Sequence, residues 1–198
     1  MFQKSQSQFA YQQIDKVGLI VGHTKKAPGA KVISTSGNIT SEYQYHKSVV
    51  EKITGPSIVA KEAQFAHIAY RDNHGIEGAT REIIKADIDL SIELHTNASN
   101  GSASGVEAFY YMPNSKIICD LYCQMFATRF KRKNRGAKDI KKNGRGVTNL
   151  SLLQDIPYAI LVEPFFGDNQ DDYVSVIMYA TFLDDFARMI KSESLKWS

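Results

Sequence analysis

The sequence predicts an α/β fold: a single domain whose mostly parallel, twisted sheet is flanked by helices on both faces. Strand-like and helix-like segments alternate along the chain, as they do where crossover helices join parallel strands. The run at 158–162 is apolar throughout, which is typical of a strand buried on both faces. The 198 residues, 43% of them hydrophobic, suit one domain with a sizeable core.

The N-terminal half begins with a short apolar strand at 16–22, followed by a loop rich in glycine and proline. A helix is expected at 41–53, because Ser41 is a suitable cap and apolar side chains recur at helical spacing. These side chains are Tyr45, Val49 and Ile53. The segment 56–63 is a strand candidate, and 75–87 has a helical pattern.

In the C-terminal half, 87–95 alternates strictly, so it is expected to be a strand with one apolar face. That face comprises Ile88, Leu90, Ile92 and Leu94. A strand at 105–112 and a helix at 115–130 come next. After a basic stretch, the apolar strand that ends at Glu163 and a helix at 171–191 complete the chain.

Charge and cysteine usage narrow the class of protein. The net charge is only +3, but eight basic residues crowd 131–145, opposed only by Asp139. Such a stretch favours a polyanionic partner, either nucleic acid or an anionic cell-wall polymer, although a solvated surface has the same composition. Cys119 and Cys123 stand four apart in a predicted helix and are interpreted as buried or free thiols.

The first 16 residues contain no apolar core of a secretory signal, and no run reaches the length of a membrane span. The protein is therefore expected to be made in the cytoplasm without a signal peptide and to have no stable association with a membrane.

Three predicted strands end on a residue that can bind metal or move a proton: His23, His95 and Glu163. A fourth such residue, Glu42, opens the first helix. Ligands of open α/β sheets bind beyond the carboxyl ends of the strands, so these groups are expected to share one edge. Two histidines and a carboxylate, with water as fourth ligand, make a common catalytic zinc site, and a further glutamate serves as general base. Sequence spacing does not decide whether Glu42, Glu93 or Glu163 is the ligand.

The remaining histidines are interpreted as structural. His46 falls on the first helix, His67 follows the 56–63 segment, and His74 lies in a turn-like stretch. A single histidine is more often a hydrogen-bonded structural residue than a metal ligand, so only the combination at the strand ends points to chemistry.

Five motifs in order resemble those of the zinc-dependent N-acetylmuramoyl-L-alanine amidases of the Amidase_3 type. The segment GHTKKAPGA, at 22–30, is similar to the opening GHGGxDPGA, and DLSIELHTNAS, at 89–99, to D-x-x-x-S-I-H-A-N-A. GVEAFYY at 105–111, NRGAK at 134–138 and PYAILVEPFFGDNQDD at 157–172 also resemble family motifs.

This resemblance implies that His23, Glu42 and His95 hold one Zn²⁺ per chain and that Glu163 acts as general base and acid for a zinc-activated water. The bond cleaved would join N-acetylmuramic acid to L-alanine of the peptidoglycan stem peptide. Residues that bind this substrate are not assigned.

The implied domain organisation is an N-terminal extension at 1–15 and an amidase catalytic domain at 16–198. Peptidoglycan is the expected partner, and a monomer is expected.

A phage endolysin, which accumulates in the host cytoplasm and acts on the wall after release, is consistent with the missing signal; a bacterial autolysin remains open. Expected consequences are cell lysis and an antimicrobial effect.

The chain departs from the family pattern at several positions, which indicates a divergent member. Ile20 stands where the family usually has aspartate, Thr24 and Lys25 replace two glycines, Glu93 replaces a strand serine, and Phe165 replaces a glycine.

Two alternatives remain. A zinc carboxypeptidase acting on stem peptides would use a similar ligand set. A non-enzymatic, basic nucleic-acid-binding protein would use 131–145, but that stretch lacks interleaved aromatic residues, so no nucleic-acid partner is expected. A serine hydrolase is discounted, because Ala103 occupies the nucleophile position of GSASG.

Overall fold

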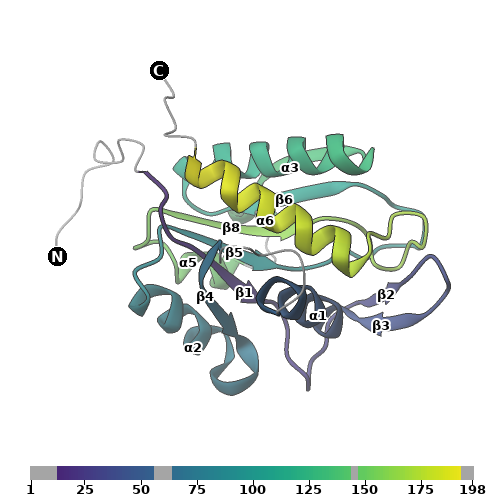
Figure 1. The fold of residues 1–198 in the computed structure, drawn as a ribbon, viewed down its shortest axis with the longest axis horizontal. Helices are drawn as coiled ribbons and strands as arrows, with labels where there is room; N and C mark the ends of the chain where they lie inside the picture. Colours follow the sequence, from purple (N-terminus) through teal and green to yellow (C-terminus); the bar gives the residue numbers. More distant parts are fainter. Residues whose placement is uncertain (1–12, 56–63, 144–146, 193–198) are drawn as a thin grey trace.

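The computed structural model describes residues 13–55, 64–143 and 147–192. It contains a six-stranded sheet with strand order β4-β1-β5-β8-β6-β7 (Figure 1). Neighbouring strands are parallel except for β6 and β8, which are antiparallel. The strands are β1 (Val17–Val21), β4 (Phe65–Tyr70), β5 (Leu90–Leu94), β6 (Val106–Tyr110), β7 (Asn134–Asp139) and β8 (Tyr158–Glu163). The predicted α/β class with a mostly parallel sheet is confirmed.

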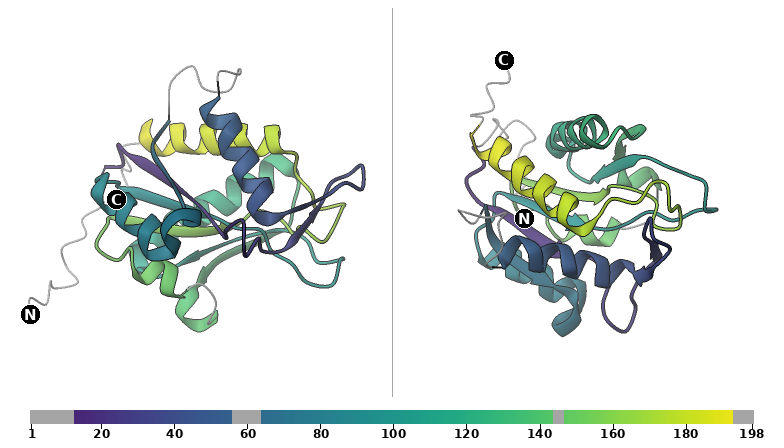
Figure 2. Two further views of the ribbon diagram at one scale, coloured as in Figure 1. Left: turned by 90° about the horizontal axis from the view of Figure 1, so that it is seen from below. Right: turned by 45° about the vertical axis from the view of Figure 1, so that its right-hand side comes forward.

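Helices cover both faces of this sheet (Figures 1 and 2). Helices α1, α3 and α6 pack on one face, where Val49, Tyr122 and Phe182 belong to the same apolar cluster as Leu19 of β1. On the other face, α2 and α5 contribute Ile83 and Leu150 to a second cluster, which includes Ile20 of β1. The helices are α1 (Glu42–Thr54), α2 (Arg71–Lys85), η1 (Pro113–Ser115), α3 (Lys116–Phe130), α4 (Ile140–Asn143), α5 (Val147–Ser151) and α6 (Val176–Ser192).

The central strands β1 and β5 and nearly all of β8 are buried, since successive side chains point to opposite faces and each face carries helices. Leu90, Ile92 and Leu94 form the predicted apolar face of β5, whereas Ile88 lies before the strand and packs in the second cluster. The other face of β5 is also closed to solvent. Ser91 and Glu93 on that face are both fully buried. A carboxylate inside a central strand needs partners, because its burial is otherwise strongly unfavourable.

Several boundaries differ from the predictions. The closing helix begins at Val176 instead of 171, and α2 begins at Arg71, before the predicted 75. The α2 segment contains a break where His74 and Gly75 leave helical geometry. The strand candidate at 56–63 lies outside the described residues.

Four strands were not predicted, and one of them is β4, which begins just after the 56–63 candidate. Strands β2 (Lys31–Ile33) and β3 (Ile39–Ser41) form a separate antiparallel pair within the glycine- and proline-rich loop. The basic stretch contains β7, which pairs with β6 at the edge of the sheet. An edge strand is held mainly by backbone hydrogen bonds on one side, so few of its side chains need to be apolar.

The register of the central strands brings the predicted residues to one edge. Val21 is paired with Leu94, and Leu94 with Val162. Two further backbone hydrogen bonds extend this alignment, from Gly22 N–H to Leu94 O (3.1 Å) and from His95 N–H to Val162 O (3.0 Å). The residues that follow β1 and β5 therefore emerge beside the last residue of β8.

The structure also bears on the two cysteines and on membrane-spanning helices. Cys119 and Cys123 are buried free thiols in α3, as expected. Among the described residues, no helix has both the length and the apolar character that crossing a membrane requires.

Candidate active site

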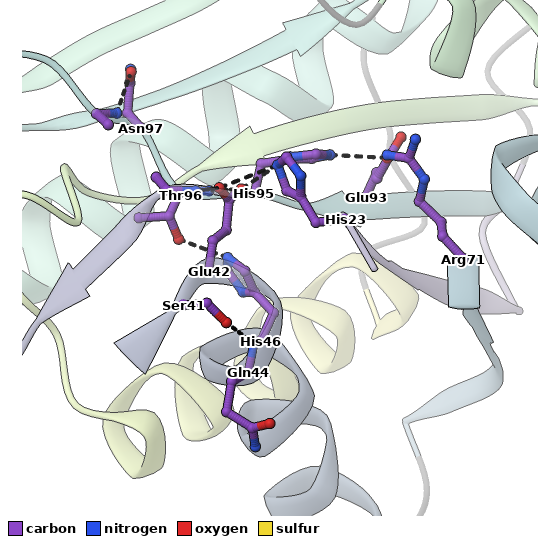
Figure 3. Close-up of polar contacts among 12 residues, drawn as sticks. His23, Ser41, Glu42, Gln44, His46, Arg71, Glu93, His95, Thr96 and Asn97 are labelled. Atoms are coloured by element: carbon purple, nitrogen blue, oxygen red, sulfur yellow. Dashed lines mark hydrogen bonds and ion pairs between the residues drawn. The ribbon is translucent and has the colours of Figure 1, made fainter. Parts of the chain in front are cut away.

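The site centres on Glu42, whose carboxylate lies between two histidine rings (Figure 3). Its Oε2 is 3.2 Å from His23 Nε2, and its Oε1 is 3.1 Å from His95 Nδ1. One ligand atom from each of the three residues lies within 4.8 Å of the other two, so a single ion could contact all three. The two predicted strand-end histidines and the first residue of α1 are thus brought together.

Backbone conformation places His23. This residue has φ of +63°, in the left-handed region that a histidine seldom occupies. Such strained conformations persist where the surroundings enforce them, and they concentrate at functional sites. The loop after His23 folds back through Gly29 (φ +77°), where a Cβ atom would lie 2.4 Å from Glu42 Oε2. Only glycine lets the loop pass this close to the carboxylate.

Glu42 is held from several directions. Its carboxylate accepts hydrogen bonds from the backbone N–H of Ala30 (2.9 Å) and of Thr96 (2.8 Å). It also stands at the N-terminus of α1, where the helix dipole favours negative charge. Burial alone would raise the pKa of Glu42, but hydrogen bonds with the two histidines outweigh it and hold that pKa well below its usual range. The carboxylate is therefore ionised and rigid.

His95 is buried, and its two ring nitrogens have different partners. Nδ1 faces Glu42, whereas Nε2 lies 2.9 Å from Oε1 of Glu93. Burial alone would lower the pKa of His95, but the hydrogen bonds to the two carboxylates raise it to about 10. The backbone of Gly22 packs against the imidazole ring of His95, so a Cβ atom at position 22 would lie 2.7 Å from Nε2.

The donor set fits a zinc ion. Two imidazole nitrogens and one carboxylate oxygen are a recurring ligand set of catalytic zinc, and they leave a fourth position for water or substrate. The two histidines meet edge to face, with ring centroids 4.9 Å apart, so both present nitrogen toward the carboxylate. Of the carboxylates left open by sequence spacing, Glu42 is the one that groups with both histidines.

A cavity of about 630 Å³ opens beside this group. Glu163, the last residue of β8, lines it together with all three candidate ligands. Phe109 and Leu161 contribute apolar side chains to its lining. Further lining residues are Gly29, Ala30, Arg71, Thr96, Asn97, Ala98, Glu107, Ile140 and Asn149. The cavity is large enough for a small part of an extended substrate, with the ligand group at its wall.

Asn97 and Arg135, which belong to the quoted motifs, meet at another cavity residue. Asn97 Nδ2 donates to Glu107 Oε1 (2.6 Å), and Arg135 Nε donates to Glu107 Oε2 (2.8 Å). The guanidinium of Arg135 also lies over the ring of Phe166, 4.9 Å from its centroid. Arg135 therefore joins β7, β6 and the loop after β8.

Two of the other three histidines have polar partners outside the candidate metal ligands. His46 is buried on α1, its Nε2 lies 2.8 Å from Thr96 Oγ1, and burial lowers its pKa to about 3. His67 pairs with Glu82 at 3.3 Å, and His74 lies at the break in α2. The contacts of His46 and His67 agree with their structural interpretation, and that of His74 stays a prediction.

Sequence reasoning missed the residues behind His95. Arg71, the first residue of α2, contacts Glu93 at 3.4 Å, and Asn149 of α5 donates to the same oxygen at 2.8 Å. Neither residue carries a sequence signal, because their importance depends on how two helices pack on the sheet.

Comparison with solved structures shows related folds. The catalytic domain of an endolysin that targets Clostridia difficile is 26% identical, with 88% of this chain and 97% of that chain covered and a TM-score of 0.61. The catalytic domain of CwlV, an amidase from Bacillus (Paenibacillus) polymyxa, is 17% identical, with coverage of 88% and 96% and a TM-score of 0.64. AmiC2 of Nostoc punctiforme is 15% identical, with coverage of 91% and 97% and a TM-score of 0.64.

A search of curated protein sequences gave no match. A family model described as N-acetylmuramoyl-L-alanine amidase, Amidase_3, matches residues 17–191. These residues include the three candidate ligands, Glu163 and every strand of the sheet. The chain therefore belongs to the N-acetylmuramoyl-L-alanine amidase family Amidase_3 and is an amidase that acts on peptidoglycan.

Proposed function

We propose that this amidase is zinc-dependent and hydrolyses the amide between N-acetylmuramic acid and L-alanine of the stem peptide. In this proposal His23, Glu42 and His95 hold one zinc ion, and Glu163 is the catalytic acid and base. The observation that carries it is the convergence of two imidazoles and a carboxylate on the wall of a cavity that Glu163 also lines.

The chemistry follows from the placement of these groups. When bound, zinc polarises the scissile carbonyl and lowers the pKa of water to about 7. Glu163 accepts the proton of the attacking water and delivers it to the leaving amine as the tetrahedral intermediate collapses. Glu42, already ionised and held by two backbone N–H groups, keeps its position without reorganisation.

The test joins zinc content, product identity and one substitution. The purified protein is expected to contain about one zinc per chain and to clear a peptidoglycan suspension in a chelator-sensitive way. Its product should carry a free lactyl carboxylate on muramic acid and a new N-terminal alanine. Release of C-terminal amino acids instead would indicate a carboxypeptidase.

Glu163→Gln removes the proton acceptor but keeps the shape of the side chain. We expect it to retain zinc and lose at least about 100-fold in kcat, since positioned acid–base groups contribute about 10²- to 10⁴-fold. Glu51→Gln, on the exposed side of α1, is the matched control and should behave as the parent protein. A fully active Glu163→Gln would remove Glu163 from the mechanism.

The biological role that we propose is cell lysis by a phage endolysin. Its support is the 26% identity to an endolysin catalytic domain over most of both chains. Expression inside a bacterial host with and without a holin tests this role: lysis that needs the holin supports it. Lysis without the holin would contradict it.

A further inference from the structure

Glu93 lies next to the candidate metal site and makes contacts that the proposed mechanism does not use. It is the last but one residue of β5, two residues before His95, so both side chains point to the same face of the sheet. Its side chain is fully buried. The corresponding position of the quoted family motif is a serine, so the glutamate is a departure of this chain.

The two ring nitrogens of His95 face different carboxylates. Glu93 Oε1 lies 2.9 Å from Nε2, so a proton on Nε2 is held by a carboxylate. The opposite nitrogen, Nδ1, faces Glu42 and the other candidate ligands. A histidine ligand uses one nitrogen for the metal, and the hydrogen bond made by the other fixes its tautomer and orientation.

Glu93 is itself fixed by two helices on the second face of the sheet. Arg71 supplies the positive charge that a buried carboxylate requires, and Asn149 supplies a neutral donor. Figure 3 shows Arg71 and Glu93 together on the side of His95 away from Glu42. With the backbone of Gly22 against its Nε2 edge, the His95 ring has little freedom to rotate.

We propose that Glu93, held by Arg71 and Asn149, is a positioning residue that orients His95 for metal binding and completes a carboxylate–histidine–metal triad. Glu93 accepts the hydrogen bond of Nε2–H, which leaves the lone pair of Nδ1 for the ion. This inference rests on the metal site of the proposed function. Groups of this kind change metal affinity by about 10- to 100-fold.

The experiment measures metal binding directly. Zinc affinity is determined at constant pH by competition with a chromophoric chelator, and the visible spectrum of the cobalt-substituted protein reports ligand geometry. Glu93→Ser, which restores the motif residue, is expected to weaken zinc binding by about 10- to 100-fold and to alter the cobalt bands, with a stoichiometry of about one retained at saturation.

Glu93→Gln keeps the volume and an oxygen acceptor for Nε2–H, so it provides a second variant that preserves packing around Arg71. We expect an intermediate loss of affinity, and therefore partial rescue relative to serine. Glu82→Gln is the matched control, because Glu82 also pairs with a histidine, His67, outside the site. It should leave zinc affinity and the cobalt spectrum unchanged.

The outcomes separate this inference from the proposed function. If the parent protein binds zinc and both Glu93 variants match it in affinity and cobalt spectrum, the positioning role is overturned and the metal site stands. If the parent protein binds no zinc, both fail. Weaker binding in Glu93→Ser with partial recovery in Glu93→Gln supports the triad.

Discussion

At the scale of single residues, the site depends on how a few buried charges compensate one another. Glu42 is stabilised as an anion by two histidines and two backbone N–H groups. His95 is stabilised as a cation between Glu42 and Glu93, although burial opposes its charge. In the metal-free protein these groups form a hydrogen-bonded chain, and a bound metal ion would take over the positive charge from the proton on His95.

The extra proton on His95 must leave when a metal ion binds Nδ1. Because the pKa of His95 is raised to about 10, the metal-free protein carries a proton on both ring nitrogens at neutral pH, and Nδ1 must lose one to become a ligand. Zinc binding near neutral pH should therefore release about one proton from this residue, and the apparent affinity should rise with pH until about 10. Calorimetric titrations in buffers of different ionisation enthalpy give the number released.

The pH dependence of the stability of the metal-free protein tests the raised pKa of His95 without zinc. A histidine whose folded pKa lies above its unfolded value stabilises the folded state below the unfolded pKa, and this contribution is lost as pH rises through the folded pKa. For the metal-free protein the loss should therefore fall between about 6.5 and about 10. Zinc binding with no proton release would contradict the charged state assigned to His95.

At the scale of elements, each chemical group is carried by the end of a strand or the start of a helix. The strands β1 and β5 deliver His23 and His95, and β8 ends at Glu163. Helix α1 delivers Glu42 at its first position, directly after the cap residue Ser41. The relative positions of these side chains therefore depend on the residues at which the strands end and the helix begins.

The cap of α1 can be tested separately. Ser41 Oγ accepts a hydrogen bond from the N–H of Gln44 (3.2 Å), which satisfies one of the free donors of the first turn. Ser41→Ala should lower the free energy of unfolding by about 1 kcal/mol, measured by urea denaturation. Ser41→Asp, which preserves a capping oxygen, should retain most of the stability. Equal losses in the two variants would show that the cap hydrogen bond is not the cause.

The elements that could be predicted from sequence are the ones with a strong apolar pattern. The helix at 41–53, the strand ending at Glu163 and the helix at 115–130 are present within one or two residues of their predicted bounds. Strand β7 has the sequence NRGAKD and was missed, since its place comes from pairing with β6 and not from burial. Composition alone does not reveal an edge strand of this kind.

The candidate site was predictable only in part. Strand-end histidines and the rule for α/β sheets were enough to group His23 and His95. The choice among Glu42, Glu93 and Glu163 was not available from spacing, because it depends on the strand register and on where α1 begins. The role of Glu93 was hidden further, since the alternating pattern of β5 gave no sign that its second face is closed by helices.

At the scale of the whole molecule, the sheet order places the chemistry centrally and the basic stretch at one side. β1, β5 and β8 are consecutive in the sheet, whereas β7 is the outermost strand beyond β6. Ile140, which directly follows β7, lines the cavity. Two cations of the stretch serve the fold, because Arg132 pairs with Asp172 and Arg135 with Glu107. Lysines at its surface are available to an external polyanion.

Those surface lysines are expected to attract anionic wall polymers. Lys131, Lys133 and Lys142 are exposed, so their attraction to anionic wall polymers should be screened by salt, with a screening length of about 10 Å at about 0.1 M. Raising salt from about 0.05 to about 0.3 M should weaken binding to intact walls several-fold, measured by sedimentation. The rate at which the enzyme cleaves a soluble muropeptide with an uncharged glycan should change much less, because the cavity does not include these lysines.

A triple variant, Lys131→Gln, Lys133→Gln and Lys142→Gln, separates this effect from general effects of salt on the enzyme. It should bind intact walls weakly at low salt and show a shallower salt dependence, while its cleavage of the soluble substrate stays near that of the parent protein. Walls stripped of anionic polymers should abolish the difference between the two proteins. If the variant retains parent-level, salt-sensitive binding, the attraction resides elsewhere on the surface, and the basic stretch serves only the edge of the sheet.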